Sequence, residues 1–278
     1  MIRRTPEAIV TAHMMDPSRR ELFVEGSRDR LFLRWLLGEH LHPNANVIEI
    51  SAINIPFVDA GGERGRLMAF ARWVNGHDVK IRFFADADFD RLLRRAVPRK
   101  VWFTDSRDME WYIVNESCLE KVLKLGVATE VLTALELLGT VQTLGRRPGL
   151  LRVLSEIQAL ELPFQRTDLS RFLRYTAGRL RLDFDGYVQA LLQNAGISLR
   201  KKNSVLQGVA VLEQQYAEFP DCEIIHGKDA FSIIVKALSR FGAKESEAVK
   251  MLWTSFEAVF VTAGSNLKAV QEYLKGSV

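Results

Sequence analysis

Residues 20–110 alternate between short apolar runs and longer segments that have one polar face. Apolar runs of this length predict buried β-strands, and they occur at 21–24, 46–51, 79–85 and 100–103. Residues 29–37 and 63–75 lie between these runs and carry apolar side chains at helical spacing. A short basic helix is expected over 89–97, ended by Pro98. Strands that alternate with helices predict an α/β fold, a parallel sheet with helices on both faces.

After about residue 108 the pattern becomes mostly helical. Residues 222–225 are a candidate fifth strand. We therefore expect an α/β core at 15–115, a helical and partly basic insertion at 116–220, and a C-terminal strand with helices at 221–278 that completes the core. Helical spacing covers 109–134, 149–160, 169–181, 185–195, 204–219, 246–264 and 266–275.

The composition is that of a globular protein. The chain has 278 residues, of which 47% are hydrophobic and 26% charged, and its net charge is +4. No apolar run is long enough to span a membrane, and no signal peptide is recognisable at the N-terminus, so we expect a cytoplasmic protein without a membrane partner. Cys118 and Cys222 are too far apart in sequence for a zinc spacing and too few for a disulfide framework.

Acidic side chains follow three of the predicted strands. In a parallel sheet, reactive groups gather beyond the carboxyl ends of the strands, so we expect these carboxylates to meet. Crowded carboxylates repel one another unless a cation neutralises them, and oxygen ligands favour Mg²⁺ or Mn²⁺ over zinc. The three clusters are Glu25 with Asp29, then Asp86 with Asp88 and Asp90, then Asp105 with Asp108 and Glu110.

Other interpretations of residues 86–90 remain open. Aspartates spaced in this way also cap the turn before a helix, without any metal. A phosphatase with an aspartyl nucleophile at Asp86 places the same motif after an apolar strand. An EF-hand loop is excluded, because its sixth and twelfth positions would be Arg91 and Val97 instead of Gly and Glu.

The order of these motifs resembles the TOPRIM fold. Glu25-Gly26 after the first strand, Asp29 four residues later and Asp86-Ala-Asp88 after the third strand are similar to the variant in overcoming-lysogenisation-defect nucleases. Residues 103–112 and 225–231 resemble a TOPRIM-like family that includes the AriB-type effectors of the PARIS anti-phage system.

That resemblance implies a metal-dependent nuclease that cleaves RNA, including tRNA, or DNA. It implies a toxic effector in anti-phage defence, controlled by an ABC-type ATPase partner. Glu25 would be a metal ligand and the general acid or base, Asp86 and Asp88 would hold Mg²⁺, and Asp29 would help to hold a second ion. Asp90 and Glu110 would be additional ligands.

Basic residues provide the remaining candidates. Lys228 follows the candidate fifth strand and is a candidate catalytic cation, because a positive group offsets the charge that develops on a phosphodiester. Residues 143–202 hold eleven basic and five acidic side chains. This excess of positive charge is typical of a protein surface that binds nucleic acid, or of a solvated helical face. The nucleic-acid-binding candidates in this stretch are Arg171, Arg174, Lys201 and Lys202.

Three functions therefore stay open at this point. The first is the nuclease, the second a non-catalytic TOPRIM-like binding module, and the third a phosphatase for small substrates. The chain has no Gly-x4-Gly-Lys-Ser/Thr loop, so any dependence on ATP would come from the partner. Apolar faces expected within 246–275 would serve a homodimer or close the core.

Overall fold

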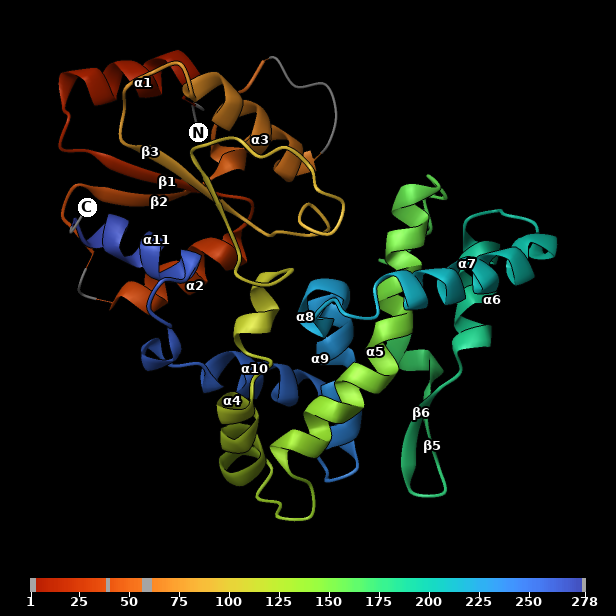
Figure 1. The fold of residues 1–278 in the computed structure, drawn as a ribbon. Helices are drawn as coiled ribbons and strands as arrows, with labels where there is room; N and C mark the ends of the chain where they lie inside the picture. Colours follow the sequence, from red (N-terminus) through yellow and green to blue (C-terminus); the bar gives the residue numbers. More distant parts are fainter. Residues whose placement is uncertain (1–3, 39–40, 57–61, 277–278) are drawn as a thin grey trace. The chain divides into compact units, whose positions relative to one another are not determined.

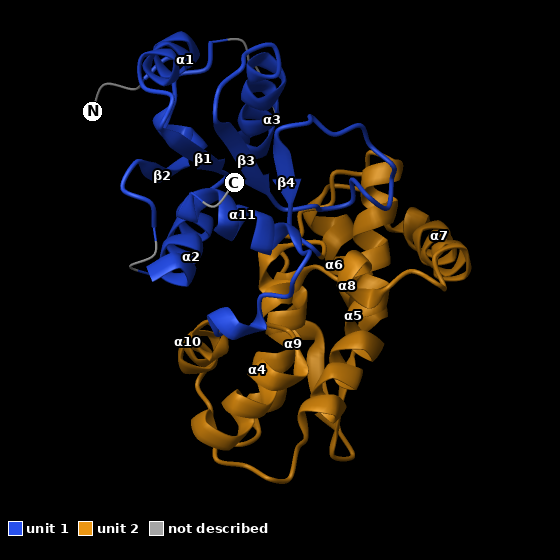
Figure 2. Cartoon of the chain, turned by 60° about the vertical axis from the view of Figure 1, so that its left-hand side comes forward, with its two compact units in different colours: residues 1–105, 257–278 blue, residues 106–256 orange. Residues whose placement is uncertain are grey.

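The computed structural model describes residues 4–38, 41–56 and 62–276. The chain forms two compact units (Figure 2). The first contains residues 1–105 and 257–278, and the second contains residues 106–256. Residues 106–115, expected in the α/β core, and residues 221–256, expected to complete it, belong to the second unit.

A parallel sheet of four strands forms the centre of the first unit. The strands are β1 (Arg20–Val24), β2 (Ala45–Glu49), β3 (Ile81–Ala85) and β4 (Val101–Phe103), in the order β2-β1-β3-β4. All neighbouring pairs are parallel. The α/β class with a parallel sheet is thus confirmed.

Helices cover both faces of this sheet (Figure 1). Helices α1 (Pro6–Met15) and α3 (Gly62–Val74) lie on one face, and α2 (Ser27–Leu37) and α11 (Asn266–Lys275) lie on the other. Under α3, the rings of Phe23, Phe70 and Phe83 pack with centroids 5.1 to 5.6 Å apart. This aromatic cluster fixes strands β1 and β3, whose carboxyl ends carry the candidate site.

The second unit is mostly helical. Its longest helix is α5 (Ala134–Ile157), which packs against α7 and α9. A Cβ at Gly149 of α5 would overlap the carbonyl oxygen of Ile224, so glycine allows this close approach. The other elements of the unit are α4 (Glu116–Lys121), the π-helical turn Val122–Gly126, β5 (Leu173–Thr176), β6 (Arg179–Leu182), α6 (Phe184–Asn194), α7 (Lys202–Gln215), α8 (Asp221–Ile224), α9 (Gly227–Ser239) and α10 (Glu245–Ser255).

Three predicted elements have the wrong type, and the helices expected over 109–134 and 246–264 are interrupted or shorter. Residues 88–94 form successive turns instead of a basic helix, and Asp88 and Arg94 adopt positive φ angles of 46° and 51°. Residues 222–225 belong to a short helix and its C-cap instead of a fifth strand. The helix expected at 169–181 is the hairpin β5–β6, whose turn residues Ala177 and Gly178 both have positive φ angles, as a two-residue hairpin turn requires.

None of the helices within the described part of the chain is long and apolar enough to cross a membrane.

Candidate metal centre

The candidate site lies at the carboxyl edge of the sheet in the first unit. Glu25 directly follows β1 and Asp86 directly follows β3. These two strands are hydrogen-bonded neighbours and run in the same direction, so both residues emerge at the same edge. The order of the strands therefore brings together segments that are about sixty residues apart in sequence.

Arg64, on the first turn of α3, joins the acidic side chains of this edge. Its guanidinium lies 3.1 Å from Glu25 Oε1 and 3.2 Å from Asp88 Oδ2. It also donates a hydrogen bond of 2.7 Å to Asp90 Oδ2 and another to the backbone carbonyl of Asp86. Glu25, Asp88 and Asp90 thus converge on one cationic group. We call Glu25, Arg64, Asp86, Asp88 and Asp90 the Arg64 cluster.

The turn that carries the three aspartates is held in place by hydrogen bonds between side chains and the backbone. The Ala87 N–H donates to Thr104 Oγ1 at 2.9 Å, and the Arg91 guanidinium donates to the carbonyls of Thr104 and Asp105. The left-handed backbone at Asp88 falls in a region that aspartate tolerates better than most residues. These contacts fix residues 86–90 beside strand β4.

Glu25 has a strongly perturbed acidity. Its side chain is 23% exposed, and burial raises its pKa from 4.5 to about 7. Arg64 opposes this rise, whereas the negative charges of Asp88 and Asp29 add to it. A carboxyl group that titrates near neutral pH is suited to take up and release protons in general acid–base catalysis.

Asp29 has a structural contact of its own. Its Oδ2 accepts a 3.0 Å hydrogen bond from the Gly26 N–H, which closes the first turn of α2. An acidic side chain is also favourable at this helix N-terminus. Asp29 therefore lies near Glu25, as the spacing predicts, and at the same time stabilises the start of α2.

The carboxylates of the Arg64 cluster are suited by their chemistry to a hard divalent cation. Oxygen ligands from Glu25, Asp88 and Asp90 already surround a positive charge, which is the electrostatic requirement of such a site. In the described residues, however, no group of three His, Cys, Asp or Glu side chains is spaced to hold a metal. A bound ion would therefore require Arg64 to leave its present position.

The third acidic cluster has other roles. Asp105 accepts hydrogen bonds from the backbone N–H groups of Asn266 and Leu267, at 2.7 and 3.3 Å, and so caps α11. Asp108 and Glu110 lie in the second unit, where Asp108 Oδ2 accepts a 2.7 Å hydrogen bond from the Gly227 N–H.

Glu110 and Lys228 both belong to the second unit. Glu110 is 6% exposed and lies so close to Gly227 that a Cβ there would overlap it. Lys228 is exposed in the first turn of α9, next to the capping residue His226, whose Nδ1 accepts the Lys228 N–H. Their roles at the metal centre remain predictions.

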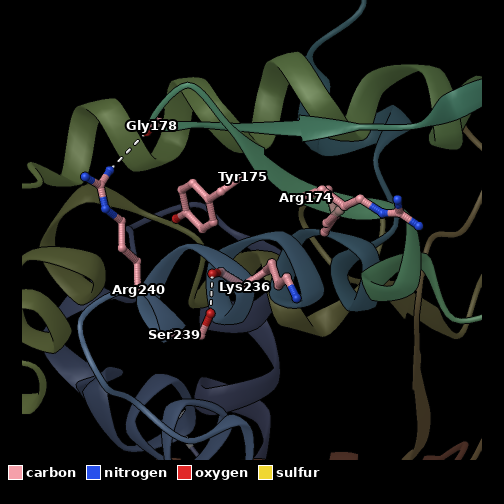
Figure 3. Close-up of a pocket in the computed structure, with 7 residues that line it drawn as sticks. Arg174, Tyr175, Gly178, Lys236, Ser239 and Arg240 are labelled. Carbon is pink, nitrogen blue, oxygen red and sulfur yellow. Dashed lines mark hydrogen bonds between the residues drawn. The ribbon is translucent and has the colours of Figure 1, made fainter.

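The nucleic-acid-binding candidates are also in the second unit. Arg171 and Arg174 are exposed at the start of the β5–β6 hairpin, and Arg174 lines a surface pocket of about 540 Å³ (Figure 3). Lys201 is exposed before α7, whereas Lys202 lies 3.3 Å from Asp185. Lys202 is therefore partly neutralised.

Comparison with known proteins gives no family for this chain: no family model matches it, and no curated protein matches it.

Arg64 was not identified as a site residue from the sequence, where residues 63–75 were predicted only as a helix between two strands. A usable signal was present. Arg64 follows the second predicted strand, at the start of the next helix, and so belongs to the same carboxyl edge as Glu25. A cation at that position among several acids predicts an ion-pair cluster.

Proposed function

We propose that this chain is a metal-dependent nuclease of the TOPRIM-like class. The observation that carries the proposal is the convergence of Glu25, Asp88 and Asp90 on a single positive charge at the carboxyl edge of a parallel sheet. Phosphodiester hydrolysis by two bound Mg²⁺ or Mn²⁺ ions needs such a set of carboxylates, because the ions supply an activated water and stabilise the leaving oxygen.

In this proposal, the acidic residues of the Arg64 cluster and Asp29 have separate roles. Asp86, Asp88 and Asp90 would hold the first ion, and Glu25 with Asp29 would complete the site. Glu25 has a pKa raised to about 7 by burial, so it is also the group that would transfer a proton. Glu110 is included in the proposal because of the resemblance. Lys228 is included because the reaction needs a positive group near the phosphodiester.

The β5–β6 hairpin is the part of the second unit best suited to bind the substrate. Arg174 and Arg181 stand directly opposite each other across the two strands, and both are exposed. Like charges in this position destabilise a hairpin unless an anion lies between them. On the other side, the Tyr175 ring faces Lys236 and Arg240 of the α9 region, and Arg240 donates to the Gly178 carbonyl at 3.0 Å (Figure 3).

Cleavage assays with purified protein test the catalytic part of the proposal. We expect cutting of RNA or single-stranded DNA with Mg²⁺ or Mn²⁺, and none in EDTA. Glu25→Gln and Asp88→Asn should each lower the rate by at least about 100-fold, because each removes a ligand or proton-transfer group. Glu63→Gln is the matched control, since Glu63 precedes Arg64 but pairs with Arg66 at 3.6 Å. Equal activity of Glu25→Gln and wild type would contradict the proposal.

Binding measurements test the hairpin separately. In the Glu25→Gln background, the Arg174→Gln/Arg181→Gln double variant should bind single-stranded RNA about tenfold more weakly and with a smaller salt dependence. The control is Lys202→Gln, because Lys202 already has Asp185 as a partner. An unchanged affinity of the hairpin variant would exclude this surface.

The cellular role follows from the resemblance alone. We propose an effector of anti-phage defence that an ABC-type ATPase restrains, which predicts toxicity on expression and its loss in Glu25→Gln. Toxicity that persists in a folded Glu25→Gln protein would contradict a nuclease-based effector.

A second candidate function rests on Arg64. Because its guanidinium already neutralises the carboxylates, the cluster is electrostatically satisfied without an ion, as in a non-catalytic binding module. Calorimetric titration separates the two functions. Mg²⁺ or Mn²⁺ binding that strengthens in Arg64→Gln supports the metal centre, and no binding in either protein supports the module.

A further inference from the structure

A second site lies in the first unit, at the amino ends of the strands. Residues before or within the first two positions of β1, β3 and β4 line a cavity of about 1140 Å³, and α11 contributes one of its walls. Glu25 and Asp86, at the carboxyl ends of the same strands, do not line it. The cavity is therefore distinct from the Arg64 cluster, and the inference below does not depend on the proposed nuclease activity.

The lining of this cavity is basic. Four cationic side chains face only two carboxylates, those of Asp78 and Glu272. In the described part of the chain, no carboxylate lies within ion-pair distance of Lys80, Arg82 or Lys100. The four cationic residues are Arg20, Lys80, Arg82 and Lys100. Such an excess of positive charge around one cavity favours an anionic ligand.

The two central cations are positioned by the backbone and keep donors for a ligand. Lys100 Nζ donates to the carbonyls of His77 and Val79 at 2.7 and 3.1 Å, which uses two of its three protons. Among the described residues, the Arg82 side chain has one hydrogen-bond partner, the carbonyl of Ile81 at 3.3 Å. Burial lowers the pKa of Lys100, repulsion from the charge of Arg82 lowers it further, and the carboxylate of Asp78 acts in the opposite direction. An anion between Lys100 and Arg82 would relieve that repulsion.

Aromatic side chains form the apolar wall of the cavity. The Arg82 guanidinium lies 5.6 Å from the centroid of the Trp102 ring, and Trp102 packs edge-on against Tyr273 at 5.6 Å. The Tyr273 hydroxyl hydrogen-bonds to the Lys80 carbonyl at 2.5 Å, which fixes this wall to the start of β3. A pocket with several cations and one aromatic wall has the composition of a site for an organic anion.

We propose that this cavity binds a phosphate-bearing ligand, with the phosphate oxygens held by Lys80, Arg82 and Lys100 and the organic part lying against Trp102. The guanidinium of Arg82 is suited to phosphate because its planar donors match two phosphate oxygens at once. The cavity, at about 1140 Å³, is large enough to admit a nucleotide. The phosphate could belong to a free nucleotide or to a nucleic-acid end.

Calorimetry in EDTA with the full chain tests the proposal, and the absence of metal keeps it independent of cleavage. The probes are pyrophosphate, ATP and a 5′-phosphorylated ten-nucleotide RNA. We expect saturable binding of at least one probe, weakened about tenfold by Arg82→Gln and by Lys80→Gln. Lys80 is exposed, so Lys80→Gln should leave the fold intact. This variant therefore still tests binding if Arg82→Gln lowers the stability of the protein. Tighter binding of ATP than of the RNA identifies a free nucleotide, and the reverse identifies a nucleic-acid end.

The matched control is Arg99→Gln. Arg99 precedes Lys100, is exposed and does not line the cavity, so its loss changes net charge equally without touching the site. Arg99→Gln should retain wild-type affinity. Equal weakening by Arg99→Gln and Arg82→Gln would overturn the proposal, because it would show non-specific attraction. Failure of all three probes to bind would also overturn it.

Discussion

Replacing Glu25 by Gln should stabilise the protein in metal-free buffer above pH 7. Glu25 has a folded-state pKa of about 7, raised from 4.5 chiefly by burial. A carboxyl group with a raised folded-state pKa contributes stability that is full below about pH 4.5 and is lost as the pH rises through 7. The amide side chain of the Glu25→Gln variant cannot ionise, so the variant escapes this loss.

The magnitude follows from the same two pKa values. Each pKa unit is worth about 1.4 kcal/mol, so ionised Glu25 lowers the free energy of unfolding by up to about 3 kcal/mol at pH 8. At pH 5 the folded state keeps the proton and only the unfolded state is mostly ionised, so the loss is about 1 kcal/mol. The advantage of Glu25→Gln should therefore be about 2 kcal/mol larger at pH 8 than at pH 5.

Urea denaturation in EDTA at the two pH values measures this difference. Glu21→Gln is the control with the opposite sign. Burial alone would raise the pKa of Glu21, but its contacts with His13 at 3.5 Å and Arg4 at 2.9 Å outweigh burial and hold the pKa below its usual value. Stability from a lowered pKa is lost only as the pH falls below 4.5, so Glu21→Gln should destabilise the protein more at pH 8 than at a third, more acidic point of about pH 3. If Glu25→Gln destabilises the fold at pH 8, the dominance of burial at Glu25 is refuted.

Four further substitutions test the packing within each of the two units. Asp105→Asn weakens the cap of α11 and should lower the free energy of unfolding by about 1 kcal/mol in a urea titration. Arg152 forms two hydrogen bonds with Asp229, at 2.8 and 2.9 Å. Arg152→Leu leaves the buried Asp229 without this cation and should lower the free energy of unfolding by about 3 to 5 kcal/mol. A decrease of less than about 1 kcal/mol would contradict a structural role for this ion pair. Gly149→Ala should lower the melting temperature, whereas Gly139→Ala in the same helix, with open space at its Cβ, should raise it through about 1 kcal/mol of helix propensity.

The sheet could be predicted from the sequence because its strands are short apolar runs separated by amphipathic helices. The hairpin β5–β6 could not be predicted from the sequence, because its apolar positions also fit helical spacing. Its turn gives no signal at Ala177, since alanine does not usually adopt the positive φ angle that it has there. Ile224 and Ile225 are apolar for a different reason than a strand requires. They pack as a short helix and its cap against the glycines of α5.

The candidate site was predicted in part. The order of the strands was sufficient to place Glu25 and the aspartates of residues 86–90 at one edge, and the structure brings Glu25, Asp88 and Asp90 to the same guanidinium. Arg64 was missed because a single cation carries no motif. Asp105 was grouped with the acids of the site, but its carboxylate is used by the N-terminus of α11, a helix more than 150 residues further along the chain.

The late position of α11 has a consequence for synthesis on the ribosome. The Tyr273 hydroxyl bonds to the carbonyls of Glu21 and Lys80, so this last helix secures strands that emerge from the exit tunnel far earlier. Until α11 has been translated, α2 alone covers its side of the nascent sheet, which leaves apolar surface exposed to other chains. Chaperone dependence of newly made protein should therefore fall once α11 has left the ribosome and packed on the sheet.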